Sequence, residues 1–270
     1  GGALSAEQLV QACLARIREE EPAVQAWQHL DEAHALSQAR ARDADRAEGR
    51  PIGPLHGVPV GIKDIIDTAD MPTEDGTVLH AGRTPARDAS VVAQLRAAGA
   101  VILGKTVTTE LATYAPGKTR NPHDPARSPG GSSSGSAAAV AAGMVPLAVG
   151  TQSNASVIRP AAYCGVFGFK PSYGLVSRHG ILKLSPSLDT VGVFARTLDD
   201  VALIIEQITG ADENDVSTRP HARLPFLQTL ATEPPLPPRL AFVKTPVWDR
   251  TEPATREAVA ELVEALGASC

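Results

Sequence analysis

The stretch GGSSSGSAAAVAAG, residues 130–143, joins a glycine- and serine-rich loop to an alanine-rich run that favours a helix. A second cluster, TQSNAS, follows at residues 151–156, and Lys63 lies upstream in the strand-like segment VPVGIKD, residues 58–64. The first loop leads directly into the alanine-rich run, which disfavours a flexible linker. Two serine clusters and one lysine, with no histidine among them, predict a serine hydrolase whose base is a neutral lysine.

Two other interpretations of the serine-rich loop fail on their sequence context. A phosphate-binding loop needs Gly-x-x-x-x-Gly-Lys-Ser/Thr, and no lysine follows these glycines. Residues 131–135 also match Gly-x-Ser-x-Gly, the nucleophile elbow of α/β-hydrolases, which requires a strand immediately before it. Here residues 121–129 precede the match and contain Pro122, Pro125 and Pro129, which exclude a central strand. The elbow match is therefore accidental.

The composition suits one large soluble domain. The 270 residues are 43% hydrophobic with a net charge of −5, which permits a sizeable core and gives no basic footprint for nucleic acid. There is no apolar run of 18 residues and no signal-peptide pattern at the start, so we expect a cytoplasmic protein with no membrane partner. Cys13, Cys164 and Cys270 are odd in number and far apart, which argues against a disulfide framework. The histidines show no metal-ligand spacing such as His-Glu-x-x-His, and no metal is expected.

Hydrophobic periodicity predicts strands alternating with helices. Ser5 and Gln8 form a capping-box pattern before the first helix. The predicted helices are residues 6–20, 31–48, 89–98, 134–142, 198–209 and 254–266, and the predicted strands are residues 58–66, 101–103, 145–149, 166–169 and 240–243. The alternation favours an α/β sheet covered on both faces, with an irregular proline-rich segment at residues 220–238.

The serine-rich stretch resembles the core of the amidase signature family. The resemblance continues through residues 150–162 (GTQSNASVIRPAA) and 163–172 (YCGVFGFKPS). It also includes residues 57–64, 98–106 and 187–192, and it covers roughly residues 50–210. A signature of this length is far more specific than a short pattern.

The resemblance implies the amidase-signature α/β/α fold, a twisted mixed sheet with helices on both faces. On this basis residues 1–270 form a single amidase domain. Its expected parts are N-terminal helices in residues 1–50, the signature core at about 50–210, a proline-rich connector at 220–238 and the start of a C-terminal part at 239–270. The chain stops at what reads as a turn, residues 267–270, so we expect it to lack the last strands and helices of the fold.

By position, the Ser–cis-Ser–Lys triad of the family falls on Ser156, Ser132 and Lys63. Ser156 would attack, Ser132 would relay the proton, and Lys63 would accept it. Ser133 and Ser134 would then serve as hydrogen-bonding and helix-capping residues. A lysine base must be desolvated or placed near positive charge to be neutral at pH 7, and the apolar run around Lys63 suits this. Without the resemblance, a surface lysine on an edge strand would be the better interpretation of Lys63.

The resemblance places the oxyanion hole on the backbone amides of Ser153, Asn154, Ala155 and Ser156. The chain departs from the family here, because two glycines normally precede the nucleophile. Asparagine tolerates a left-handed backbone, but alanine does not, and a positive φ at Ala155 would cost ~1–2 kcal/mol or displace the donor. Ala155 is thus the residue on which activity depends.

Three further residues have alternative roles. Arg159 either meets a substrate carboxylate, as an arginine here does in relatives resembling malonamidase, or bonds loop carbonyls. Asp189 is expected to be a structural hydrogen-bond acceptor near the site. Cys164, among apolar neighbours, is expected to pack in the core.

The resemblance implies an amidase that hydrolyses a small-molecule carboxamide through a seryl acyl-enzyme and releases ammonia or an amine, with no cofactor. A homodimer is left open. One alternative is the glutaminase-type A subunit of a tRNA-dependent amidotransferase, which usually reads Gly-Gly-Ser-Ile-Arg around the nucleophile. This chain reads NASVIR at residues 154–159, and the shifted arginine favours a stand-alone amidase. A second alternative is an amidase-fold protein that Ala155 has impaired.

Overall fold

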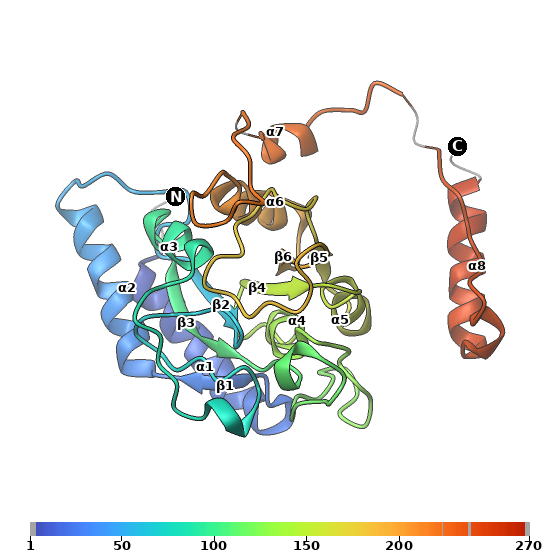
Figure 1. The fold of residues 1–270 in the computed structure, drawn as a ribbon, viewed down its shortest axis with the longest axis horizontal. Helices are drawn as coiled ribbons and strands as arrows, with labels where there is room; N and C mark the ends of the chain where they lie inside the picture. The colour runs from blue at the N-terminus through green and yellow to red at the C-terminus, as the bar shows by residue number, and fades with distance from the viewer. Residues whose placement is uncertain (1–3, 223, 237–238, 268–270) are drawn as a thin grey trace. The chain divides into compact units, whose positions relative to one another are not determined.

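The computed structural model describes residues 4–222, 224–236 and 239–267. These residues fall into two compact units, one up to Leu230 and one from Ala231 (Figure 1). The boundary lies inside the segment expected to be a proline-rich connector. That segment is not irregular throughout, since it contains the short helix α7 (Phe226–Leu230). The expected turn at residues 267–270 lies, beyond its first residue, outside the described residues.

A six-stranded mixed sheet forms the centre of the first unit, as predicted. Its order is β1-β3-β2-β4-β6-β5, in which β3, β2 and β4 run parallel while β1, β6 and β5 pair antiparallel with their neighbours. The strands are β1 (Trp27–Leu30), β2 (Pro59–Lys63), β3 (Val101–Thr106), β4 (Leu147–Gln152), β5 (Phe167–Phe169) and β6 (Thr190–Ala195). Residues of β2, β3 and β6 are buried throughout, so the sequences of these strands do not alternate between buried apolar and exposed polar residues.

Helices cover both faces of this sheet and enclose two hydrophobic cores (Figure 1). The main helices are α1 (Ala6–Val24), α2 (Glu32–Ala47), α3 (Ser90–Ala97), α4 (Ser134–Ala141), α5 (Ile158–Cys164) and α6 (Leu198–Ile208). Apolar residues of α1, α2, α4 and α5 fill one core, and those of α3 and α6 fill the other. The predicted α/β/α layering is confirmed.

Local sequence signals account for where the helices begin. The Ser5 hydroxyl accepts from the Gln8 N–H at 3.0 Å while the Gln8 side chain accepts from the Ser5 N–H at 2.9 Å, which completes the predicted capping box. The Thr197 hydroxyl caps α6 in the same position by accepting from the Asp200 N–H. In α4, however, Ser133 is the N-cap residue but its side chain makes no capping hydrogen bond.

The structure differs from the sequence-based elements in several places. Strands β1 and β6 and helices α5 and α7 were not predicted, and the predicted strand at Leu240–Val243 is wrong, since these residues have no regular secondary structure. A strand needs a neighbouring backbone for its hydrogen bonds. In the described part of the second unit the regular elements are the helix α8 (Pro253–Gly267) and a short 3₁₀ turn (Trp248–Arg250), which offer no such edge.

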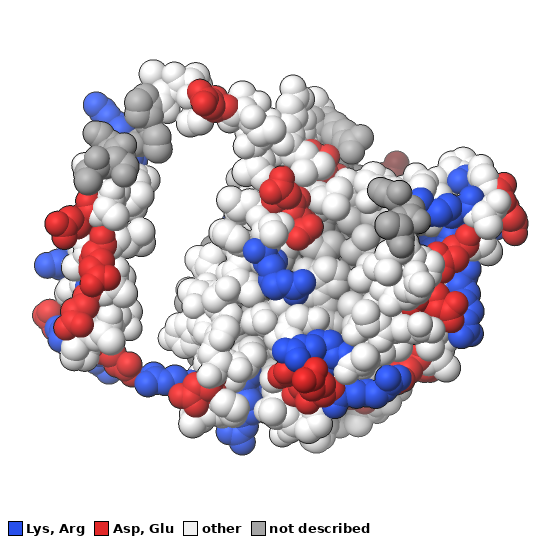
Figure 2. Space-filling model, turned by 180° about the vertical axis from the view of Figure 1, so that it is seen from behind, with Lys and Arg blue, Asp and Glu red and all other residues white. Residues whose placement is uncertain are grey.

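Charged side chains of both signs lie beside one another on the face of the first unit seen in Figure 2. Ion pairs at the surface of this unit include Arg40–Glu7, at 2.8 Å. None of the helices in the described ranges is long and apolar enough to cross a membrane.

Candidate active site

Lys63 and Ser132 meet in the interior of the first unit. The Lys63 Nζ donates to Ser132 Oγ at 2.7 Å and to Thr151 Oγ1 at 2.9 Å. Lys63 is fully buried and Ser132 is almost so. The structure thus brings together two of the three predicted triad residues through direct hydrogen bonds, and it adds Thr151, which the sequence reasoning did not assign.

The topology of the sheet explains this meeting. Lys63 ends β2 and Thr151 lies at the end of β4, and because these two strands are parallel neighbours their carboxyl ends lie at the same edge. Ligand sites in α/β sheets form at such carboxyl ends. Ser132 lies in the loop that enters α4, the helix that precedes β4.

Ser133 ties the two serine clusters to each other. Its hydroxyl donates to the Thr151 carbonyl at 3.1 Å and accepts from the Thr151 N–H at 3.2 Å. Gly150 permits this approach, since a Cβ there would lie 2.6 Å from Ser133 Oγ. Ser134 instead donates to the Val107 carbonyl. The predicted hydrogen-bonding role of these two serines is present, but it is not helix capping.

Burial shifts the titration of Lys63 toward neutral pH. Desolvation lowers the pKa of its amine to about 7, and the charge of Asp189 opposes this shift. A neutral amine in this position has a lone pair available for the Ser132 hydroxyl while one N–H still donates to Thr151. The electrostatics therefore meet the requirement of a lysine that accepts protons near neutral pH.

Ser156 lies in the loop between β4 and α5. Its carbonyl accepts from the Ser133 N–H at 3.4 Å, so the loop lies against the first serine cluster. The residue is 8% exposed, and within the described residues its hydroxyl has no hydrogen bond. The Gln152 side chain shapes the loop by accepting from the N–H groups of Val157 and Ile158 at 2.8 and 3.1 Å. A nearly buried hydroxyl with no partner is compatible with a nucleophile that awaits its substrate.

The backbone around the serines is unusual in two places. The peptide bond between Gly131 and Ser132 is cis. Ala155, immediately before Ser156, has φ +61°. The left-handed conformation considered for Ala155 from the sequence is thus present, although alanine pays a steric penalty there that glycine does not.

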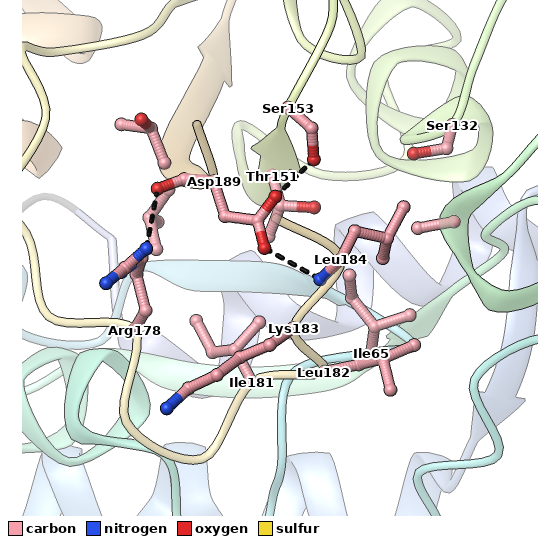
Figure 3. A pocket seen from close by; sticks show the side chains of 13 residues that line it. Ile65, Ser132, Thr151, Ser153, Arg178, Ile181, Leu182, Lys183, Leu184 and Asp189 are labelled. Atoms are coloured by element: carbon pink, nitrogen blue, oxygen red, sulfur yellow. Dashed lines mark hydrogen bonds between the residues drawn. The ribbon is translucent and has the colours of Figure 1, made fainter. Parts of the chain in front are cut away.

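A small cavity opens beside Ser132 and Thr151 (Figure 3). Ser153 and Asp189 point toward one another at its edge, and the Ser153 hydroxyl donates to the Asp189 carboxylate. The same carboxylate accepts from the backbone N–H groups of Leu184 and Ser185 at 2.7 and 2.8 Å. Asp189 is the hydrogen-bond acceptor that the sequence predicted. The apolar part of the lining is Ile65, Ala112, Ile181, Leu182, Leu184 and Val191.

Arg159, in the first turn of α5, bonds the two serine-bearing loops. Its Nε donates to the Gly131 carbonyl at 3.0 Å, and its Nη2 donates to the Asn154 carbonyl at 3.2 Å. These are the contacts of the loop-bonding alternative. The role of Arg159 in binding a substrate carboxylate stays a prediction.

A second buried lysine lies on β3, the strand that pairs with β2, and was missed. Lys105 Nζ on β3 donates to the Ile66 carbonyl at 2.8 Å and lies 3.6 Å from Asp64 Oδ1. Burial lowers the pKa of Lys105 to about 8 and raises that of Asp64 to about 6. The apolar run VILGKT, residues 101–106, could have indicated a buried lysine, because it has the same pattern as the run that ends at Lys63.

Cys164 is buried in the core, as expected, and burial raises the pKa of its thiol to about 12. Among the residues that the structure describes, no three His, Cys, Asp or Glu side chains are grouped so that they could hold a metal ion.

Comparisons with known proteins identify relatives of this chain. The A subunit of the glutamyl-tRNA(Gln) amidotransferase of Rhodopirellula baltica is 42% identical over 267 residues, which cover 96% of this chain and 53% of that protein. The protein of the same name from Chloroflexus aurantiacus is 46% identical over 225 residues, 81% of this chain and 46% of the relative. The chain thus spans about half the length of these curated relatives.

Solved structures give the same picture. The native peptide amidase from Stenotrophomonas maltophilia superposes with a TM-score of 0.80 at 40% identity, over 85% of this chain and 50% of that one. An amidase family protein from Bacillus anthracis superposes with a TM-score of 0.79 at 36% identity, over 84% and 48%. The family model described as Amidase matches residues 8–269. By sequence and by fold, the chain belongs to the amidase signature family.

Proposed function

We propose that this chain carries the catalytic residues of an amidase that hydrolyses a carboxamide C–N bond through an acyl-enzyme on Ser156. The observation that carries the proposal is the 2.7 Å contact between Lys63 Nζ and Ser132 Oγ, made by a lysine whose pKa burial lowers to about 7. A serine hydroxyl becomes a nucleophile only when a base takes its proton, and this pair supplies the base and a relay.

In the proposed reaction, Ser132 transfers its proton to the neutral Lys63 amine and receives the proton of Ser156. The Ser156 oxygen forms a bond to the amide carbon, which becomes tetrahedral. The C–N bond then breaks, and the proton returns from Lys63 through Ser132 to the departing nitrogen. Water, activated by the same two residues, cleaves the ester and releases the acid. Thr151 holds the Lys63 amine in place during both halves.

The tetrahedral oxygen would be bound by the backbone amides of Ser153, Asn154, Ala155 and Ser156. Each such donor contributes ~3 kcal/mol to stabilisation of a transition state. The positive φ of Ala155 supports this assignment, since the loop adopts here the conformation that glycine would favour. The rest of the fold compensates for the strain energy of this conformation. The backbone amides are thereby held in a fixed geometry.

A second candidate function is the glutaminase role of the A subunit in a tRNA-dependent amidotransferase. Curated relatives that carry this name are 42–48% identical to the chain. Against it stands the segment NASVIR at residues 154–159, which shifts the arginine by one position from the Gly-Gly-Ser-Ile-Arg of that protein. An impaired amidase is the third alternative, because Ala155 replaces a glycine.

Labelling with a fluorophosphonate tests the proposal on the full chain. The reagent forms a bond from phosphorus to Ser156 Oγ, fluoride leaves, and mass spectrometry locates the adduct. A screen of amides with ammonia detection then follows. We expect the adduct on Ser156 and ammonia release without partner proteins. Absence of the adduct would show that the proposal of a hydrolase is wrong. Glutaminase activity that appears only with the other amidotransferase subunits present would favour the second candidate.

A further inference from the structure

The register of strands β4 and β6 places Asp189 opposite Ser153. Strands β4 and β6 pair antiparallel up to Gln152 and Thr190, so Ser153 and Asp189 are the next residues on the two strands. Their side chains meet across this gap, and the Ser153 hydroxyl donates to Asp189 Oδ1 (Figure 3). The carboxylate is thereby attached to the first residue of the segment whose amides would bind the oxyanion.

The carboxylate is fixed from its other side as well. Its Oδ2 accepts from the N–H groups of Leu184 and Ser185 at 2.7 and 2.8 Å. The three hydrogen bonds leave an ionised carboxylate little freedom to rotate, and bonds to a charged acceptor are the strong ones.

A buried arginine holds the backbone of the same segment. Arg178 Nη1 donates to the Pro186 carbonyl at 2.8 Å and to the Asp189 carbonyl at 3.4 Å. Its guanidinium is itself paired with Asp215, at 3.3 Å between Nε and Oδ2. Arg178 is 8% exposed. The position of Asp189 is thus determined by groups on two sides.

We infer that Asp189 is a positioning residue of the proposed hydrolase, which holds Ser153 and with it the backbone amides that would bind the oxyanion. The inference rests on the proposed function and assigns a residue to it beyond the triad. Asp189 does not exchange protons with the substrate; it acts through Ser153 and through the field of its charge.

The charge of Asp189 has a second consequence at Lys63. Among the described residues, the charged group that acts on this amine is Asp189. The Asp189 carboxylate raises the pKa of Lys63 against the effect of burial. It therefore favours the ammonium that forms when Lys63 takes the proton of the nucleophile.

Four variants of the full chain test the inference by the rate of fluorophosphonate labelling between pH 5 and 9. Asp189→Asn keeps the shape of the side chain but removes its charge. We expect its labelling rate to fall ~100-fold, the effect of one lost oxyanion donor. Labelling requires the neutral lysine, so the midpoint of its pH dependence should move to lower pH. Ser153→Ala should lower the rate without moving the midpoint, and Ser153→Thr, which keeps the hydroxyl, should retain the rate.

Asp88→Asn is the matched control. Asp88 also accepts a backbone N–H, from Ala69 at 2.8 Å, and pairs with Arg96, but it lies outside the cavity lining. It should change neither the rate nor the midpoint. A wild-type rate and midpoint in Asp189→Asn would overturn the inference, as would a fall in melting temperature with an unmoved midpoint. A wild-type chain that takes up no label would overturn the hydrolase itself and the inference with it.

Discussion

Lys63 Nζ lies 2.7 Å from Ser132 Oγ, although 69 positions of sequence separate the two residues. The contact is buried, and Thr151 Oγ1 completes the surroundings of the amine at 2.9 Å. A charged ammonium would lose its hydration in this buried place, which is unfavourable, and the pKa of Lys63 therefore falls to about 7. In the proposed function, this burial is what makes Lys63 usable as a base.

Lys63→Met is expected to reduce acylation of Ser156 by about 10²–10⁴-fold, the usual contribution of a general base. Methionine fills a similar volume but cannot accept a proton. The measurement is the rate of fluorophosphonate labelling at pH 8. Lys183→Met is the control, because Lys183 lines the same cavity yet is exposed. Retained labelling in Lys63→Met would remove lysine from the role of base.

The pH dependence of the wild-type rate should follow the titration of Lys63. Its neutral form is the active one, so the rate is expected to rise about tenfold per pH unit below pH 7 and to level off above it. Initial rates of amide hydrolysis in constant-ionic-strength buffers measure this. A rate that still rises near pH 10 would show that the base keeps the ordinary pKa of a lysine.

Stability should depend on pH through the same residue. Between pH 7 and 10.5 the folded state holds Lys63 neutral while the unfolded chain holds it charged, so the unfolded state binds more protons and the free energy of unfolding rises with pH. This slope is about 1.4 kcal/mol per pH unit for one group. Lys63→Met lacks this slope. The free energy of unfolding of the variant, minus that of the wild type, should therefore be greatest below pH 7 and decline above it. Urea denaturation at pH 6, 7.5 and 9 checks this, and a constant difference would contradict the assigned pKa.

Ala155→Gly should relieve the left-handed strain at φ +61°. The gain of ~1–2 kcal/mol in the folded state is partly offset by the greater entropy of glycine in the unfolded chain, which leaves about 0.5 kcal/mol of net stabilisation. Activity should be preserved or raised. Ala98→Gly is the contrast, because Ala98 has φ −74° and the change there should destabilise by about 1 kcal/mol. A large loss of activity in Ala155→Gly would show that the methyl group is a specific adaptation.

Arg159→Leu should lower the rates on acidic and neutral amides alike. The arginine connects the carbonyls of Gly131 and Asn154, so its loss loosens both serine-bearing loops whatever the substrate. Matched pairs of amides with and without a carboxylate provide the measurement. A KM increase confined to the acidic amides would instead assign Arg159 to substrate binding.

Much of the fold followed from local patterns. The capping box at Ser5 and the apolar periodicity predicted α1, and the alternation of apolar runs with helices predicted the layered sheet. Strand β1, four residues long, was missed because its stability comes from β3, which is distant in the chain. Strand β6 is six residues long, but it likewise depends on a distant neighbour, β4. The predicted strand at Leu240–Val243 does not form, since an apolar run forms a strand only where a partner backbone is available.

The sequence by itself determined which residues are proposed to carry the chemistry, because the length of the serine-rich signature selects Lys63, Ser132 and Ser156 by their positions in it. It also indicated the strained backbone at Ala155, because the steric cost of a positive φ belongs to the residue itself. Only the tertiary structure decided that Thr151 holds the lysine, that Asp189 holds Ser153 and that Arg159 bonds two loops. Those are contacts between segments brought together by strand register, and no local pattern specifies them.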